Sequence, residues 1–373
     1  MTDENLSVAV WLPTKLDELE FLQNKLRSAG VLVPGNYAGD DHYLLVDYLT
    51  AATINDCEFR ALFDRNLISP LVALAGGATV PESSQAQSNA RLAAACACFC
   101  ILARIVIEPN ISLYEYAATS GNSAAQSDAR LFRVADNSDA MAFLDIAMNR
   151  ADRLPQDLLE HVRALPEIAD QESPEKDFER PLKMWKPNYL YALKTVALRR
   201  AGLSSMDAAI ELIRWQKEDA FFTASGGMYC IAAIAHMPPK GGMLKGIHSE
   251  NLALLRSGLR NAAWDMSLLQ QFGKFARQPQ GALWSLWSTD VALREIAKSL
   301  FARDDESEQE KLIDFYERHW GKRDGQRLLA AYNEASAVVR GDTEARRLRT
   351  NELLRRIDVQ IESLEHELGL GDA

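Results

Sequence analysis

The 373-residue chain has no long hydrophobic run and no leader-like start. Its longest apolar stretch, residues 92–103, is shorter than the roughly 20 residues that a membrane-spanning helix needs. The first residues are acidic and hold only a short apolar run, which is not the pattern of a secretory signal. We therefore expect no membrane span and predict a cytoplasmic protein.

Motifs for zinc and nucleotide chemistry are also missing. The six His residues are dispersed without an HExxH pair, and the glycine-rich segments 76–84 and 240–246 lack the spacing of a P-loop. The five Cys residues are odd in number, and Cys96, Cys98 and Cys100 crowd into ACACFC. Since no CxxC pair or nearby His accompanies them, the sequence favours buried core cysteines over a disulfide framework or a zinc site.

Proline and glycine are not enriched and 47% of the residues are apolar, as in ordinary folded proteins that form one large domain or two. The formal net charge of −11 argues against a general nucleic-acid coat. Residues 181–280, however, hold 13 Lys and Arg against 6 Asp and Glu, whereas the remainder holds 28 against 46. This basic segment is either a face that meets a polyanion or a solvated helical surface.

Hydrophobic periodicity predicts strands and helices in mixed order. Strands are expected at residues 8–12, 42–49, 59–63, 105–107 and 283–287. Helices are expected at residues 14–28, 67–75, 90–102, 112–117, 139–150, 189–201, 205–220, 228–236, 252–275 and 291–301. Residues 118–140 are rich in Ser, Asn and Asp and predict irregular structure. Residues 152–180 are strongly acidic and predict either a connector or a surface helix–loop segment.

The tail, residues 304–373, is highly charged and helical in pattern. A narrow apolar stripe of coiled-coil spacing runs through Leu354, Ile357, Ile361, Leu364 and Leu368. Two interpretations remain: pairing with a second copy of the chain, or packing of a terminal helix on its own domain.

Four acidic residues, widely separated in the sequence, lie at the ends of apolar runs or on helices beside them. They are Asp64 in ALFDRN, Glu115 in ISLYEYA, Asp265 in NAAWDMSLL and Asp290 in SLWSTDVAL. In a parallel α/β sheet, such side chains can meet beyond the carboxyl ends of the strands. A cluster of carboxylates binds hard cations such as Mg²⁺ and Mn²⁺, which activate water against a phosphodiester.

Two alternatives to this interpretation stay open. Asp is a preferred N-cap where a strand leads into a helix, so each acid could be an unrelated cap, Asp290 before VALREIA above all. In addition, LLVDYL places Asp47 at the end of a longer apolar run than the one before Asp64. We favour Asp64, because Asn66 follows two residues later and a helix is expected immediately after.

The order of these motifs resembles that of PIN-domain nucleases. In that family a first strand ends in Asp-x-Asn, a second short strand precedes a helix carrying Glu, another helix carries Asp, and a later strand ends in Thr-Asp before a helix. The matching pieces here are Asp64-Arg65-Asn66, Glu115 after residues 105–107, Asp265 in an Ala-rich helix, and Ser288-Thr289-Asp290 before LREIA.

The resemblance implies an α/β fold: a PIN-like parallel sheet core flanked by helices, with a large, mostly helical insertion and a helical C-terminal tail. Because Glu115 and Asp265 are far apart in the sequence, the core would be divided. Its first part would be residues 1–118, the insertion 119–254, the second part 255–302 and the charged tail 303–373.

For the site, the resemblance implies that Asp64, Glu115, Asp265 and Asp290 hold one or two Mg²⁺ or Mn²⁺ ions. The ions would orient the scissile phosphate and lower the pKa of an attacking water, leaving a 3′-hydroxyl and a 5′-phosphate. Asn66 and Thr289 would support the site through hydrogen bonds.

The basic segment would position the nucleic acid through Lys183, Lys186, Lys194, Arg199, Arg200 and Arg260. The aromatic residues of the same segment either stack on bases or belong to the core; they are Trp185, Tyr189, Tyr191, Trp215 and Trp264.

The sequence thus predicts a metal-dependent endoribonuclease that acts on RNA or another single-stranded nucleic acid. By analogy with the family, an inhibitor or effector protein would be its partner in a toxin–antitoxin or phage-defence setting. The alternative is a non-catalytic, largely helical interaction protein that forms a homodimer through its C-terminal helix.

Overall fold

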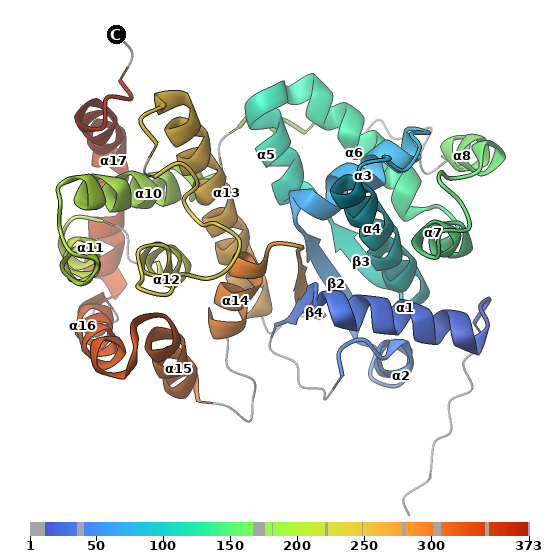
Figure 1. Cartoon of the computed structure of the whole chain (residues 1–373), viewed down its shortest axis with the longest axis horizontal. Helices are drawn as coiled ribbons and strands as arrows, with labels where there is room; N and C mark the ends of the chain where they lie inside the picture. The colour runs from blue at the N-terminus through green and yellow to red at the C-terminus, as the bar shows by residue number, and fades with distance from the viewer. Residues whose placement is uncertain are drawn as a thin grey trace, which may run out of the picture. The chain divides into compact units, whose positions relative to one another are not determined.

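The computed structural model describes residues 12–35, 41–166, 176–180, 182–220, 223–247, 249–277, 281–300, 307–339 and 343–371. The chain divides into two compact units, and Figure 1 labels most of their helices and strands. Unit 1 comprises Met1–Arg180 and Phe275–Thr289, and unit 2 comprises Pro181–Lys274 and Asp290–Ala373. In these described ranges, no helix is both long and apolar enough to cross a membrane.

Unit 1 is built on a mixed, mostly parallel sheet, as expected for an α/β protein. The sheet has the order β1-β4-β2-β3, and its strands are β1 (Leu32–Pro34), β2 (Glu58–Phe63), β3 (Ile105–Glu108) and β4 (Ala282–Trp287). The central strand β2 runs parallel to both β3 and β4, whereas β1 is antiparallel to β4. The sequence pattern predicts β2, β3 and β4 but not the edge strand β1.

The helices of unit 1 are α1 (Leu16–Ala29), α2 (Leu45–Ile54), α3 (Arg65–Ala75), α4 (Ser84–Leu102), α5 (Asn110–Ser120), α6 (Asn122–Asp136), α7 (Ala140–Ala147) and α8 (Gln156–Arg163). Helix α4 packs against α1, α3, α7 and β3. It is buried on all sides over the eight residues 93–100, which is the character of a core helix.

The three crowded cysteines lie on α4 and are fully buried and unpaired. Burial raises the pKa of the Cys98 thiol to about 12, so this thiol is protonated and unreactive at neutral pH. The interpretation of ACACFC as core sequence is confirmed. Aromatic packing joins α4 to the sheet, since Trp287 of β4 lies 5.6 Å from Phe63 and 5.9 Å from Phe99 between ring centroids.

Two sequence-based predictions for unit 1 are wrong. Residues 42–49 form no strand: helix α2 begins at Leu45 and buries Leu45, Tyr48 and Leu49, which are spaced as one face of a helix. Residues 118–140 are not irregular, because α6 occupies most of them. The expected acidic connector contains α8, and its residues 167–175, like residues 8–11 of the first expected strand, lie outside the described part of the chain.

The described residues of unit 2 form helices joined by loops. The helices are α10 (Trp185–Arg200), α11 (Ser205–Glu218), α12 (Ala224–Ala233), α13 (Leu252–Ala276), α14 (Val291–Leu300), α15 (Glu308–Trp320), α16 (Lys322–Val339) and α17 (Thr343–Glu367). The last two residues of α13, Phe275 and Ala276, are assigned to unit 1.

The described residues of the range 119–254 are mostly helical, and they are divided between the two units. Helices α6, α7 and α8 belong to unit 1, whereas α10, α11 and α12 belong to unit 2. Unit 2 begins at residue 181, and the division into a core and an insertion at residue 119 stays a prediction.

The C-terminal helix α17 packs against α10 within unit 2. Leu353 and Ile357 are buried there, whereas Leu354 is 45% exposed. The Tyr189 hydroxyl donates a hydrogen bond to Glu365 at 2.8 Å, and Lys186 pairs with Asp358 at 2.6 Å. Packing of the terminal helix on its own domain is therefore confirmed, and the buried stripe begins at Leu353 instead of Leu354.

Candidate functional site

Asp64 lies where β2 ends and α3 begins, at the N-cap position of that helix. Its backbone N–H donates to the carbonyl of Trp287 on β4 at 3.0 Å, and the residue is only 6% exposed. The carboxylate makes no capping hydrogen bond to the described first turn of α3. Its Oδ2 instead accepts hydrogen bonds from Ser288 Oγ at 2.7 Å and from Asn66 Nδ2 at 2.9 Å. The buried carboxylate thus joins the carboxyl ends of two parallel strands.

The hydroxyl that reaches Asp64 from the end of β4 belongs to Ser288, which is fully buried, rather than to Thr289. The sheet register explains this position. Phe63 pairs with Trp287, so the next residue of each strand, Asp64 and Ser288, lie side by side. The sequence alone predicts neither which strand pairs with β2 nor the register of that pairing. The motif Ser-Thr-Asp therefore could not show that Ser288, rather than Thr289, donates to Asp64.

Glu115 lies on α5, half-buried, in unit 1. The first turn of this helix is tied to the end of β2, because the buried Ser112 hydroxyl donates to the Phe63 carbonyl at 2.8 Å. Residues three apart share one face of a helix, so Glu115 follows Ser112 on that face. Glu115 therefore lies one helical turn after a residue that is bonded to the carboxyl end of β2.

Asp265 and Asp290 belong to unit 2. Asp265, on α13, accepts a hydrogen bond from the Tyr229 hydroxyl at 2.8 Å, and Asp290 Oδ1 accepts one from the Leu293 N–H at 3.0 Å. Burial raises the pKa of Tyr229 well above its ordinary value, and the negative charges of Asp265 and Asp290 raise it further. Both carboxylates are therefore near this phenol.

Asp47, the rival of Asp64, does not end a strand. It lies in the first turn of α2 and is exposed. An acidic residue is favourable there because its negative charge lies near the positive end of the helix dipole. This interaction explains an Asp at position 47 without a metal. Asp47 is a candidate metal ligand only because the sequence predicts it at the end of an apolar strand. Since it lies on a helix, that reason no longer holds.

The predicted nucleic-acid-binding residues differ in their surroundings. Lys186 is paired with Asp358, Arg199 donates to the Leu203 carbonyl at 3.1 Å, and Arg200 donates to the Ser249 carbonyl at 3.0 Å. Lys194 is half-buried, whereas Lys183 and Arg260 are exposed. Several of these cations thus hold unit 2 together, and nucleic-acid binding by the set stays a prediction.

The aromatic residues of the basic segment belong mainly to the core. Tyr189, Tyr191, Trp215 and Trp264 are buried, and Trp185 stacks on Tyr189 with 5.0 Å between ring centroids. The core interpretation is confirmed for the four buried rings.

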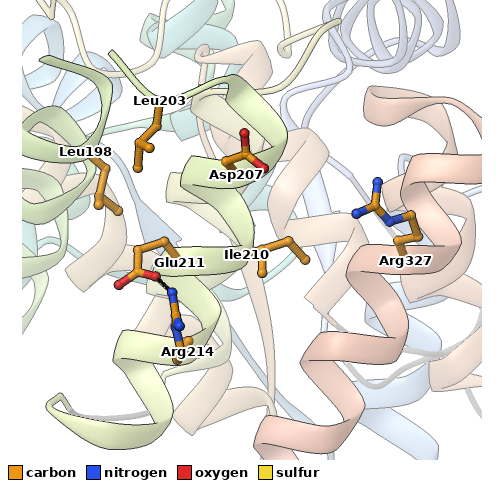
Figure 2. A pocket seen from close by; sticks show the side chains of 7 residues that line it. All are labelled: Leu198, Leu203, Asp207, Ile210, Glu211, Arg214 and Arg327. Carbon is orange, nitrogen blue, oxygen red and sulfur yellow. Dashed lines mark hydrogen bonds and ion pairs between the residues drawn. The ribbon is translucent and has the colours of Figure 1, made fainter. Parts of the chain in front are cut away.

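A pocket of about 410 Å³ lies within unit 2, between α10, α11 and α16 (Figure 2). Its lining is Leu198, Leu203, Asp207, Ile210, Glu211, Arg214 and Arg327. The charged side chains have partners close by: Glu211 with Arg214, Asp207 with the Ser204 hydroxyl, and Arg327 with Asp324. The sequence pattern does not predict this pocket.

The four predicted metal ligands thus come from both units, two from each. Among the residues that the structure describes, no group of three or more His, Cys, Asp or Glu side chains is arranged to hold a metal ion. Binding of one ion by all four acids stays a prediction. Comparison of the chain with protein-family models, with curated proteins and with solved structures found no match.

Proposed function

We propose that the chain is a Mg²⁺- or Mn²⁺-dependent, PIN-like endoribonuclease whose metal ligands are Asp64, Glu115, Asp265 and Asp290. The observation that carries the proposal is the buried carboxylate of Asp64. It ends the central strand of a mostly parallel sheet, and its side chain accepts a hydrogen bond from the end of the next strand instead of capping its own helix.

The position of Asp64 in the sheet is the one at which α/β proteins bind ligands. Strand β2 has β3 on one side and β4 on the other, both parallel to it. The chain leaves β2 toward β3 and later returns on the opposite side as β4, which makes β2 and β4 a switch point of the topology. Ligands of open α/β sheets bind beyond the carboxyl ends of the strands at such a point.

Local structure around the other three acids also fits the order of motifs in the family. A helix carrying Glu115 follows β3, a long helix carries Asp265, and Asp290 follows β4 and precedes α14. A carboxylate as buried as Asp64 is costly unless hydrogen bonds or a cation stabilise its charge. Hydrogen bonds from Ser288 and Asn66 already stabilise this carboxylate. A divalent cation bound at Asp64 would compensate its charge further and would lower the pKa of a bound water.

Ribonuclease activity is tested on the purified full chain with labelled single-stranded RNA and either Mn²⁺, Mg²⁺ or EDTA. We expect cleavage with the metals only, with 5′-phosphate and 3′-hydroxyl ends. Asp64→Asn should lower the rate by more than the roughly 10- to 100-fold that loss of an outer-shell partner costs. Asp47→Asn, an exposed acid in the same unit, is the matched control and should retain the wild-type rate.

Metal binding is tested separately by thermal unfolding with and without Mn²⁺. A ligand that binds only the folded chain stabilises it, by about 2.7 kcal/mol at 100 times its dissociation constant. We expect Mn²⁺ to raise the melting temperature of the wild type and of Asp47→Asn but not of Asp64→Asn. A wild type that neither cleaves RNA nor responds to Mn²⁺ would refute the proposal and leave the helical interaction protein, whose dimerisation light scattering would detect.

A further inference from the structure

The pocket of unit 2 has no part in the proposed nuclease, and it has the size of a small-molecule site (Figure 2). Its volume of about 410 Å³ lies within the range of about 300–1,000 Å³ that ligand pockets have. Most of the lining follows the spacing of one face of α11. The residues of this face are Asp207, Ile210, Glu211 and Arg214. The rest of the lining comes from α10, from the loop that follows it and from α16.

The apolar part of the lining consists of Leu198, Leu203 and Ile210. Leu198 is buried, Ile210 is half-buried, and Leu203, in the loop between α10 and α11, is 36% exposed. In Figure 2 the two leucines lie on one side of α11 and the guanidinium group of Arg327 lies on the other. A purely apolar ligand would desolvate the charged groups of the pocket without pairing them, which is unfavourable.

The charged part of the lining is balanced, with two carboxylates and two guanidinium groups. Glu211 pairs with Arg214, whose side chain is 61% exposed, and an ion pair on the surface is worth little. Arg327 lies 3.7 Å from Asp324, which is beyond hydrogen-bond distance, so its guanidinium group can donate to another carboxylate. The carboxylates of Asp207 and Glu211 would repel a simple anion, and the guanidinium groups would repel a simple cation. A molecule that carries both charges complements the whole lining.

We propose that this pocket binds a free α-amino acid with an apolar side chain, such as leucine. The carboxylate of the ligand accepts hydrogen bonds from Arg327, because the planar guanidinium group matches the two oxygens of a carboxylate. Its ammonium group faces the carboxylates of α11, and its side chain packs on Leu198 and Leu203. The proposal is independent of the nuclease, because the pocket lies within unit 2 and contains none of the predicted metal ligands.

The test is isothermal titration calorimetry of the full chain with L-leucine, without RNA and without added metal. Three probes each lack one part of the ligand: isocaproate lacks the ammonium group, isoamylamine lacks the carboxylate, and glycine lacks the apolar side chain. We expect leucine to bind and each probe to bind at least about 10-fold more weakly, since the loss of a hydrogen bond to a charged group or of buried apolar contact costs about that much affinity.

Two variants test the role of Arg327. Arg327→Gln should weaken leucine binding by at least about 10-fold without weakening the binding of isoamylamine, which has no carboxylate. Arg323→Gln is the matched control, because Arg323 is exposed on the same helix and does not line the pocket, and it should keep the wild-type affinity. Both arginines are exposed, so both variants should fold, which circular dichroism verifies.

The proposal is overturned if leucine does not bind, if isocaproate binds as tightly as leucine, or if Arg327→Gln keeps the wild-type affinity for leucine. Equal affinity for the uncharged N-acetylleucinamide would also overturn it, and would indicate a contact for a leucine side chain of a partner protein instead. None of these measurements reads RNA cleavage, so failure of the nuclease proposal and failure of this one are distinguishable.

Discussion

The hydrogen bond between Ser288 and Asp64 makes a quantitative prediction for Ser288→Ala. The Ser288 hydroxyl is fully buried and donates at 2.7 Å to a carboxylate that is 6% exposed. Alanine removes this donor, and water does not readily replace it at a site so buried. Because the acceptor is a carboxylate, the loss should cost about 1.5–3 kcal/mol, the range for hydrogen bonds to charged groups.

The assay is urea unfolding of the full chain, followed by circular dichroism, with thermal melting alongside. For a domain of roughly 150–250 residues each kcal/mol shifts the melting temperature by about 2–4 °C, so Ser288→Ala should melt some 3–12 °C lower. The two units can unfold separately, and the shift should appear in the transition that contains unit 1, to which both residues belong.

Ser138→Ala is the matched control, because it removes a buried serine hydroxyl of the same unit that donates to a neutral acceptor. Ser138 is 5% exposed and its hydroxyl donates to the Val134 carbonyl at 2.7 Å. A neutral bond of this kind is worth about 0.5–1.5 kcal/mol. If Ser288→Ala costs no more than Ser138→Ala, the idea that a charged hydrogen bond closes this end of the sheet is wrong.

Three further predictions concern other parts of the chain. Ile357→Ala should destabilise unit 2 by about 2–5 kcal/mol, because Ile357 is 3% exposed, whereas Leu354→Ala, at a 45% exposed position, should change the urea midpoint little. Tyr316→Phe should leave stability unchanged or raise it, since the buried Tyr316 hydroxyl has no partner among the described residues and removing an unsatisfied group relieves its desolvation. Burial raises the pKa of Asp136 to about 6, so above that pH the folded state carries a poorly solvated charge and stability falls as pH rises through 6. Asp136→Asn should therefore raise the melting temperature at pH 8, and this advantage should shrink toward pH 4; an equal gain at both values would contradict the assigned cause.

Strands β2, β3 and β4 could be predicted from the sequence because each is a short apolar run with a turn or helix signal after it. The same reasoning fails at residues 42–49, where HYLLVDYL is too short for its period to decide between strand and helix. Packing decides instead: α2 lies against β2 and buries Tyr48 next to Phe59, with 4.7 Å between ring centroids. A tertiary contact of this kind leaves no local signature.

Helix α6 shows a different limit of sequence reasoning. Its Ser, Asn and Asp residues suggest a loop, but Phe132, Val134 and Ala135 are buried in the core of unit 1. Arg65 of α3 pairs with Asp128 of α6 at 2.9 Å, a contact between residues 63 positions apart. This packing places α6 in unit 1, and the Ser- and Asn-rich composition of residues 118–140 gives no sign of it.

Asp64 and Asp290 show why the candidate site could be predicted only in part. Both follow a buried strand and precede a helix, so their sequence signatures are alike. Asp290 accepts the Leu293 N–H as an N-cap does, whereas Asp64 accepts the hydroxyl of Ser288, 224 positions away. A capping hydrogen bond depends only on the helix that directly follows the Asp. The hydrogen bond from Ser288 depends on the pairing of β2 with β4, a strand that is far away in the sequence.

This difference determines how the effect of replacing Asp290 with Asn is interpreted. Asn caps helices as well as Asp does, so Asp290→Asn should preserve α14 and remove one charge. If its unfolding matches the wild type while Mn²⁺-dependent cleavage is lost, capping does not explain the residue and a ligand role does. If cleavage is retained, Asp290 is a cap, and the metal would have to be held without it.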